Sequence, residues 1–272
     1  MSKALDSLVE LFDLERIELD IFRGRSPSDW RQRVFGGQVA GQALVAAGRT
    51  VPPDRPVHSL HAYFIRPGDP AAPIVYTVDR VRDGRSFTTR RVAAIQHGKT
   101  IFTLSASFHR EEAGGLEHAA GMPEVPPPGS IAQPDLESFP IDLRVVTPRT
   151  QQADSGRAAA IKHSLVWLRA DGELPDDPLL HVCLMTYASD LTLLDSVLRQ
   201  HGMTWTDGRI SGASLDHAMW FHRPFRADRW LLYDQESPSA SGARGLARGQ
   251  VFTQDGDLVV SVVQEGLIRP RA

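Results

Sequence analysis

Several features are scarce in this sequence, and each scarcity excludes a class of protein. The 272 residues contain one cysteine, Cys183, so no internal disulfide can form and a reducing compartment fits. The formal net charge of −3 gives no overall attraction to nucleic acid or to an anionic membrane. No uncharged apolar run approaches the ~18 residues of a membrane-spanning helix. We therefore expect a globular protein with neither nucleic acid nor a membrane as a partner.

Address signals and common cofactor motifs are also missing. The N-terminal residues lack the apolar region of a signal peptide, and the last residues are not the peroxisomal S-K-L signal, which predicts a cytoplasmic location. There is no Walker loop and no dinucleotide fingerprint. Gly212-Ala213-Ser214 is not continued as a nucleophile elbow, which argues against an α/β-hydrolase. The histidine pairs on predicted strands have odd separations and point to opposite faces, so we expect no metal and no cofactor.

The first half predicts helices followed by an antiparallel meander. Residues 5–17 suit an amphipathic helix, and residues 17–22 alternate like a half-buried strand. Val34–Leu44 is rich in glycine and alanine and suits a helix that Gly48 can close, with something, such as a curved sheet, packed close to its backbone. Four strands follow, separated by turn signals such as Asp83-Gly84: residues 59–66, 74–82, 87–96 and 100–109.

The second half repeats this order after a linker. Glycine and proline in residues 111–135 exclude a packed element and favour a semi-extended strap. Strands at 141–146 and 164–169, a helix after Asp190, and strands at 214–222, 230–236, 243–253 and 258–268 come next. Pro67 and Pro224 are 157 positions apart, as are Ser107 and Gln264. We predict a tandem duplication: unit 1–110, linker 111–139 and unit 140–272.

Tyr187-Ala188-Ser189-Asp190-Leu191 is the segment with the strongest chemical interest. Apolar residues recur at helical spacing after it, as far as His201, so Ser189 or Asp190 can cap a helix N-terminus. The same position also suits a catalytic acid or base that a helix dipole keeps ionised. The local pattern leaves both interpretations open.

Together, several motifs resemble those of the acyl-CoA thioesterase II family, the TesB type. The resemblance covers nearly the whole chain, and its motifs begin at Val34 (V-F-G-G-Q-V), Tyr63 (Y-F-I-R-P-G-D), Arg90 (R-R-V-A-A-I-Q), Tyr187 (Y-A-S-D-L), Asp216 (D-H-A-M-W-F-H-R-P-F) and Gln264 (Q-E-G). It implies an α+β double hotdog, in which an antiparallel sheet wraps a helix twice in one chain. It also implies hydrolysis of fatty acyl-CoA to free acid and CoA without a metal or redox cofactor.

The resemblance further implies a catalytic site made from Asp190, Ser214 and Gln264. Threonine is frequent in the family where this chain has Ser214, but either hydroxyl donates and accepts a hydrogen bond. In the first half, Ser59 and Ser107 occupy the positions that correspond to Ser214 and Gln264 in the repeat, and no carboxylate corresponds to Asp190. One active site per chain is therefore expected.

The mechanistic hypothesis is that these three side chains hold one water in line with the thioester carbonyl. Asp190 acts as general base or polarises the water, and the other two orient it. Backbone N–H groups at a helix start, with Gly36-Gly37 as a candidate, cradle the oxyanion. Direct attack by Asp190 to give an anhydride stays open. The alternative function is a non-catalytic acyl-CoA binding or sensing protein; an enoyl-CoA hydratase is disfavoured because it needs a histidine acting with the acid.

Three further expectations concern residues outside this set. Cys183 is interpreted as a small buried hydrophobe and Asp216 as structural. Exposed sheet edges favour a homo-oligomer, a dimer of double hotdogs. Six arginines are candidates for binding CoA phosphates: Arg66, Arg90, Arg91, Arg223, Arg244 and Arg248.

Overall fold

The structure is a computed structural model that describes residues 2–27, 33–112, 114–132, 139–146 and 163–271. The first half contains α1 (Lys3–Phe12), β1 (Glu15–Glu18), β2 (Ile21–Gly24), α2 (Gly36–Gly48), β3 (Val57–Phe64), β4 (Ile74–Asp83), β5 (Phe87–Gln96) and β6 (Lys99–His109). The second half contains η1 (Pro128–Ser130), β7 (Ile141–Val145), β8 (Ser164–Ala170), α3 (Pro178–Ser189), α4 (Asp195–Arg199), η2 (Trp205–Asp207), β9 (Ile210–Ser214), β10 (Asp216–Phe221), β11 (Leu231–Ser241), β12 (Arg244–Thr253) and β13 (Leu258–Pro270).

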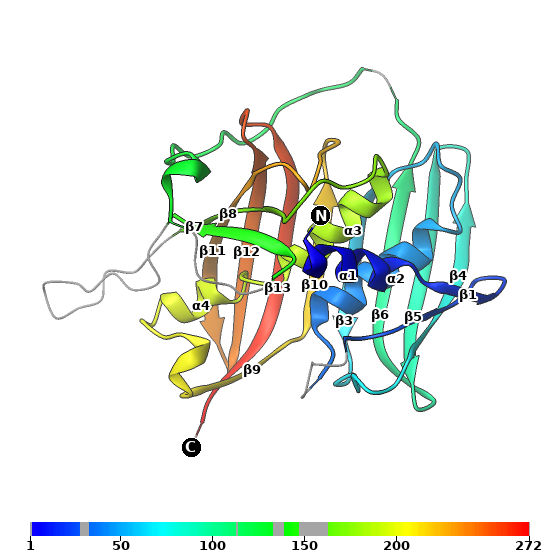
Figure 1. The fold of residues 1–272 in the computed structure, drawn as a ribbon, viewed down its shortest axis with the longest axis horizontal. Coiled ribbons are helices and arrows are strands. Elements are labelled where there is room, and N and C mark those ends of the chain that lie inside the picture. Colours follow the sequence, from blue (N-terminus) through cyan, green and yellow to red (C-terminus); the bar gives the residue numbers. More distant parts are fainter. Residues whose placement is uncertain (1, 28–32, 113, 133–138, 147–162, 272) are drawn as a thin grey trace, which may run out of the picture.

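These strands form one continuous antiparallel sheet within the described residues (Figure 1). Its order is β1-β2-β4-β5-β6-β3-β10-β13-β12-β11-β8-β7, and β9 pairs with β13 beside this path. The two halves join where β3 pairs with β10, with Leu60 opposite Met219. The helices α2 and α3 lie side by side on one face of the sheet. This is the predicted tandem helix-in-sheet arrangement.

The first meander follows the sequence pattern closely. Strands β4, β5 and β6 begin and end within one residue of the predicted ranges. The turn between β5 and β6 consists of His97 and Gly98, with φ of 48° and 69°. Positive φ at both central residues is the geometry that keeps the twist of a tight hairpin.

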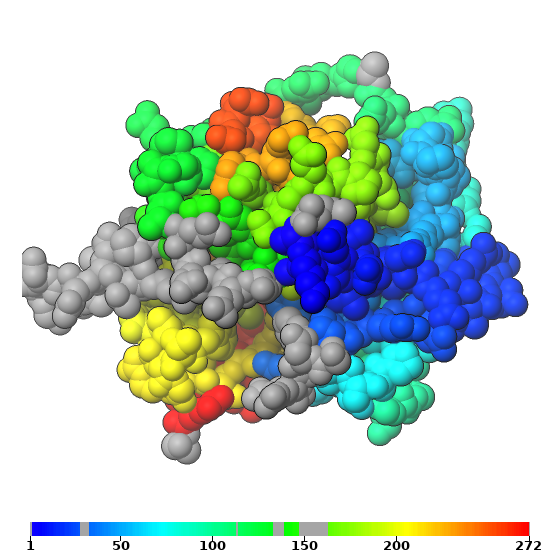
Figure 2. Space-filling model, in the orientation of Figure 1, coloured from blue at the N-terminus to red at the C-terminus, as the bar shows by residue number. Residues whose placement is uncertain are grey.

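The N-terminal segment departs from the prediction at two places. The first helix ends at Phe12, short of residue 17, and buries Leu5, Leu8 and Phe12. Residues 17–22 form parts of two strands, because Asp20 adopts φ 60° and reverses the chain between β1 and β2. Aspartate tolerates this left-handed conformation better than most residues. Helix α1 and this hairpin make a ridge across the front of the molecule (Figure 2).

The small residues of α2 allow the backbone of α3 to come close. A Cβ on Gly37 would lie 2.4 Å from the carbonyl oxygen of Tyr187, and one on Gly41 would lie 3.1 Å from that of Cys183. The prediction of close packing is right, but the partner is the second helix rather than the sheet alone. The helices run antiparallel, because Gly37 and Gly41 meet Tyr187 and Cys183 in reverse order.

The long helix of the second half, α3, lies before Asp190, and the helix predicted after Asp190 is present only as the short α4. Asp177 caps α3 by accepting a hydrogen bond from the Leu179 N–H, and Pro178 occupies the first turn. Nearly every later residue of α3 is buried, so no one-sided apolar stripe marks it. Asp190 is the C-cap residue, and only the short α4 follows at Asp195. The prediction of an N-cap at Asp190 is therefore wrong.

Residues 114–132, between β6 and β7, cross the outer face of the sheet. Met122, Val125 and Ile131 pack with Trp167 in a small core separate from the main one. The Trp167 Nε1–H donates to the Pro126 carbonyl at 3.0 Å. Positions 113 and 133–138 of the predicted linker lie outside the described residues. Among the helices of the described chain, none is long and apolar enough to cross a membrane.

Candidate active site

A cleft of about 530 Å³ opens where the two halves meet. Residues of the first half line one side, among them Phe35, Gly36 and Phe64. Asp190, Leu194 and Ser214 line the other. The cleft therefore depends on both repeats, and the C-terminus of α3 brings Asp190 to its wall.

The three predicted site residues meet at this wall. The Gln264 side chain is fully buried on the inner face of β13, and its Nε2 lies 2.7 Å from Asp190 Oδ1 and 2.8 Å from Ser214 Oγ. The Ser214 hydroxyl is 3.4 Å from the same Asp190 oxygen. Residues from α3, β9 and β13 are thus brought within hydrogen-bond distance.

The N-terminus of α2 faces the Asp190 carboxylate from the opposite half. The Gly37 N–H donates to this carboxylate. A Cβ on Gly36 would lie 2.5 Å from Asp190 Oδ2 and 2.9 Å from the Phe64 ring, so only glycine fits this approach. No side chain caps α2 at Phe35. The predicted helix-dipole contact is present, but it comes from the helix of the first half.

Burial raises the pKa of Asp190 from 3.8 to about 6. Hydrogen bonds from Gln264, Gly37 and Ser214 oppose this rise because they favour the charged form, and the Arg33 guanidinium acts in the same direction. The result is a carboxylate whose pKa lies near neutral pH while it is still mainly ionised at pH 7. Such a group suits general-base chemistry.

Two side chains near the site were not singled out by the sequence analysis. Arg33 lines the cleft and donates from Nη2 to the Gly212 carbonyl at 2.9 Å, which ties the start of α2 to β9. His217 is buried on β10, with Nε2 2.9 Å from Ser189 Oγ. Burial lowers the pKa of His217 to about 4, so the ring is neutral at pH 7. The sequence feature that could have pointed to His217 is its place in the D-H-x-M-W-F motif.

The predicted first-half counterpart of Gln264 is wrong. Ser107 alternates with the buried residues Ala106 and Phe108 of β6, so it points to the other face of the sheet. There it lies 2.8 Å from His58 Nε2. A shift of one residue exchanges the two faces of a strand, and residues 95–101 join the paired Ala94 and Phe102, whereas residues 252–259, one more, join the paired Val251 and Val260. The constant offset of 157 does not hold in these last strands.

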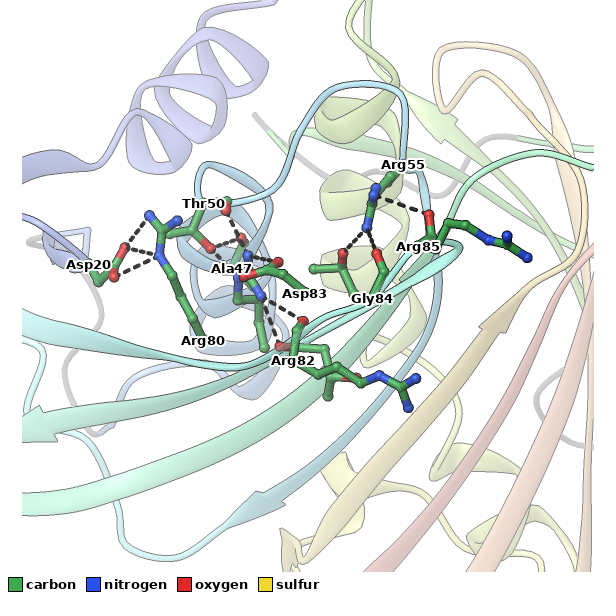
Figure 3. Close-up of polar contacts among 12 residues, drawn as sticks. Asp20, Ala47, Thr50, Arg55, Arg80, Arg82, Asp83, Gly84 and Arg85 are labelled. Atoms are coloured by element: carbon green, nitrogen blue, oxygen red, sulfur yellow. Dashed lines mark hydrogen bonds and ion pairs between the residues drawn. The ribbon is translucent and has the colours of Figure 1, made fainter.

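The six candidate arginines have different environments. Arg90 is 1% exposed and donates to Thr50 Oγ1 and Asp83 Oδ1. Figure 3 shows Thr50 and Asp83 in this polar cluster. Arg90 is therefore structural and cannot reach a CoA phosphate. Arg66 lines the cleft. Arg91, Arg244 and Arg248 form exposed ion pairs on the sheet, and Arg223 donates to the Leu258 carbonyl.

The packing answers the expectations for Cys183 and Asp216. Cys183 is fully buried in α3, and burial raises the pKa of its thiol well above the usual range, as expected for a small hydrophobe. Asp216 accepts a hydrogen bond from the Glu265 N–H at 2.7 Å, a structural contact between β10 and β13. Within the described residues, no group of three or more acidic, histidine or cysteine side chains could hold a metal ion.

Comparison with protein families gives two matches that follow the two halves. A model described as acyl-CoA thioesterase matches residues 135–267. A model described as acyl-CoA thioesterase N-terminal domain matches residues 26–109.

Individual proteins match over almost the full chain. Acyl-coenzyme A thioesterase 8 of Mus musculus is 41% identical, covering 96% of this chain and 88% of that protein. Acyl-CoA thioesterase 2 of Haemophilus influenzae is 38% identical, covering 99% of both. The crystal structure of the acyl-CoA thioesterase II TesB2 from Mycobacterium marinum is 48% identical, with a TM-score of 0.83 over 97% of this chain and 99% of that one. A hot dog fold protein from Alicyclobacillus acidocaldarius, 19% identical with a TM-score of 0.81, shares the fold.

Proposed function

Because the chain belongs to the acyl-CoA thioesterase family, as a TesB-type acyl-CoA thioesterase II, we propose that Asp190, Ser214 and Gln264 hold the hydrolytic water. The protein is a thioester hydrolase with the double hotdog fold. The observation that carries the proposal is the Gln264 amide, which donates to both Asp190 and Ser214 beside the cleft.

In the proposed reaction, the water oxygen attacks the carbonyl carbon of a fatty acyl-CoA. Asp190 takes one proton from this water, for which a pKa of about 6 is well suited. The C–S bond then breaks, CoA leaves as a thiolate, and the carboxylic acid is formed. Ser214 and Gln264 restrict where the water sits, which lowers the entropic part of the barrier.

The first turn of α2 is the proposed oxyanion site. Gly36 lines the cleft and lies against Asp190, so a carbonyl in reach of the water also lies near the helix N-terminus. Backbone N–H groups and the positive end of the helix stabilise negative charge as it develops. Removal of one such donor typically costs about 10²–10³ in kcat.

The rest of the cleft supports a place for each end of the substrate. Phe64, Leu191 and Leu194 provide an apolar wall for the acyl chain. The cleft residues Arg33 and Arg66 provide positive charge for CoA phosphates. Leu193 and Trp220 lie elsewhere: Leu193 is fully buried, and Trp220 packs on the outer face against His61.

The test is release of free CoA thiol from a C4 to C18 acyl-CoA series. Asp190→Asn is expected to lower kcat/KM by about 10²-fold or more, because general-base catalysis contributes about 10²–10⁴. Ser214→Ala and Gln264→Leu are expected to lower it less. Asp255→Asn, an exposed turn residue, is the matched control and should match the wild type.

Two outcomes would redirect the proposal. Full activity of Asp190→Asn would show that the proposed site is wrong, without affecting the assignment of the chain to the thioesterase family. Absence of thiol release by the wild type with every chain length would favour the binding or sensing function. In labelled water, the anhydride route puts ¹⁸O into Asp190 when water attacks the aspartyl carbonyl of the anhydride, whereas the proposed route leaves Asp190 unlabelled.

A further inference from the structure

The Gln264 amide must be held in one orientation for the proposed site to work. Asp190 Oδ1, at 2.7 Å, requires a donor, so the NH₂ group faces the carboxylate and Ser214. The Oε1 atom then points away from the cleft. It is buried and has no hydrogen-bond partner among the described residues. A buried acceptor left without a donor costs about 1–3 kcal/mol, so the amide would tend to rotate unless a donor is supplied.

His217 is placed to supply that donor. Strand β10 pairs with β13 so that Ala218 lies opposite Val263, and one step along this register puts His217 opposite Gln264. The two residues are 1% and 0% exposed and share the inner face of the sheet. Cβ atoms of such opposed residues lie about 4.5–5.5 Å apart. The His217 Nδ1 atom is also buried and without a partner in the described chain.

The hydrogen-bond inventory decides the tautomer of His217. Both Gln264 N–H groups already donate, one to Asp190 and one to Ser214, so only the Oε1 atom can pair with His217 Nδ1. Because Oε1 is an acceptor, Nδ1 must carry the proton. A neutral ring then has its lone pair on Nε2, so the Ser189 hydroxyl, 2.9 Å away, donates its one proton to Nε2 in place of the Thr186 carbonyl at 3.0 Å. Gln264 also opposes the effect of burial on the pKa of His217, as a hydrogen-bond acceptor does.

We propose that His217 is a positioning residue of this thioesterase: its Nδ1–H donates to Gln264 Oε1 and holds the amide NH₂ toward Asp190 and Ser214. Ser189 completes the arrangement, because it is bonded covalently to Asp190. Asp190, Gln264, His217 and Ser189 thus form a closed ring across α3, β13 and β10. His217 touches no substrate, and the inference rests on the proposed role of Gln264.

A matched pair of variants separates positioning from packing. In His217→Asn, the amide nitrogen replaces Nδ1, so the donor to Gln264 is kept while the contact to Ser189 is lost. In His217→Gln, the longer side chain replaces Nε2, so the Ser189 contact is kept and the donor to Gln264 is lost. Ser189 has a second partner, the Thr186 carbonyl at 3.0 Å, which limits the cost of the first change.

We expect His217→Asn to keep kcat within about 3-fold of the wild type. We expect His217→Gln to lower kcat by about 10- to 100-fold with little change in KM, as for a misplaced reacting group. In a Gln264→Ala background, His217→Gln should cause no further loss. Equal losses in the two variants, or losses that follow their melting temperatures, would overturn the inference.

The wild-type protein gives an independent readout if a variant does not fold. The ¹⁵N chemical shifts of the His217 ring should show a protonated Nδ1 and an unprotonated Nε2. The opposite tautomer would contradict the proposal. Full activity of Gln264→Ala would instead show that Gln264 does not help to hold the water. That result would contradict the proposed function, whereas the wrong tautomer would contradict only the role of His217.

Discussion

Asp190 combines a catalytic benefit with a cost to stability. Burial holds its pKa near 6 instead of 3.8, so the charged form is less favourable in the folded protein than in the unfolded chain. A difference of about 2 pKa units corresponds to about 3 kcal/mol, an upper value because the side chain also lines the open cleft. Active sites commonly keep such unfavourable groups for function.

The activity should depend on pH through this carboxylate. Asp190 must be ionised to accept a proton, so kcat/KM is expected to fall about tenfold per pH unit below about 6 and to level off above it. Thiol release between pH 4.5 and 8.5 measures this profile. A profile that stays flat through pH 6 would show that Asp190 does not act as the base.

The contribution of Asp190 to stability should fall as pH rises, whereas its contribution to activity rises. Because the folded pKa exceeds the unfolded one, the protonated group favours folding below pH 3.8, and this contribution is lost as pH rises through about 6. Asp190→Asn is therefore expected to be more stable than the wild type by about 1–3 kcal/mol at pH 8, with a smaller gain at pH 5. Urea unfolding at both values tests this. A gain that does not grow with pH, or that also appears in Asp255→Asn, would contradict it.

At the scale of elements, α2 and α3 depend on glycine where their backbones meet. A Cβ on Gly41 would lie 2.7 Å from the Phe12 ring and 3.1 Å from the Cys183 carbonyl oxygen. At Gly48, the nearest atoms belong to the flexible end of the Leu179 side chain. Substitution by alanine should thus have different costs at these two positions of one helix.

Gly41→Ala is expected to lower the unfolding free energy by about 1–3 kcal/mol, the usual cost of overpacking. Gly48→Ala serves as the control and should cost less, because Leu179 can adopt another rotamer and alanine favours the helix. Denaturant unfolding of both variants gives the comparison. Equal effects at the two positions would argue against a rigid α2–α3 contact.

Trp205 in η2 lines both the cleft and a second cavity of about 140 Å³. Both cavities are lined by Leu191, Asp195 and Trp205. The indole Nε1–H donates to Asp195 Oδ1 at 2.7 Å, which holds the ring in place. Trp205→Ala should join the two spaces and shift kcat/KM toward longer acyl chains, whereas Trp205→Phe should keep the wild-type order. An unchanged chain-length profile in Trp205→Ala would place the acyl chain elsewhere.

At the scale of the whole molecule, both repeats contribute to a single site. We propose that units 1–110 and 140–272 are joined by the segment 111–139. All three proposed water-binding residues belong to the second unit, but Gly36 and Gly37 belong to the first. The sheet is continuous across the β3–β10 pair, so separation of the units also exposes new strand edges.

The second unit alone should therefore have no measurable thioesterase activity. Co-expression of the two units from separate genes should restore thiol release, because α2 can then dock against α3. Activity of the second unit by itself would show that the first-turn N–H groups of α2 are not needed. The intact chain with a protease site introduced at Gly115 is the control for cleavage alone.

A dimer of double hotdogs stays a prediction, which sedimentation at several protein concentrations tests. The outer strands β1 and β7 are short and carry charged residues such as Glu15, Arg16 and Arg144. These features discourage edge-to-edge pairing of sheets. We therefore expect a dimer to use a face of the sheet or the helices.

The sequence by itself determined the features that depend on neighbouring residues. Alternation and turn signals such as His97-Gly98 located the strands, because pleating and the positive φ of a tight turn are local properties. The resemblance to the TesB-type family pointed to Asp190, Ser214 and Gln264, which the structure brings together. The near-repetition of these elements predicted two related units.

Only the tertiary structure decided what faces Asp190. Helix α3 is buried on all sides, so its sequence shows no one-sided apolar stripe. We expected a helix to begin at Asp190, whereas α3 ends there. The contact of Asp190 with Gly37 and the proposed hydrogen bond from His217 to Gln264 join segments distant in sequence. Ser107 was assigned to the wrong face because the β12–β13 hairpin is one residue longer than the β5–β6 hairpin, and a shift of one residue reverses the face of every later side chain. These relations come from packing between elements, which no local pattern records.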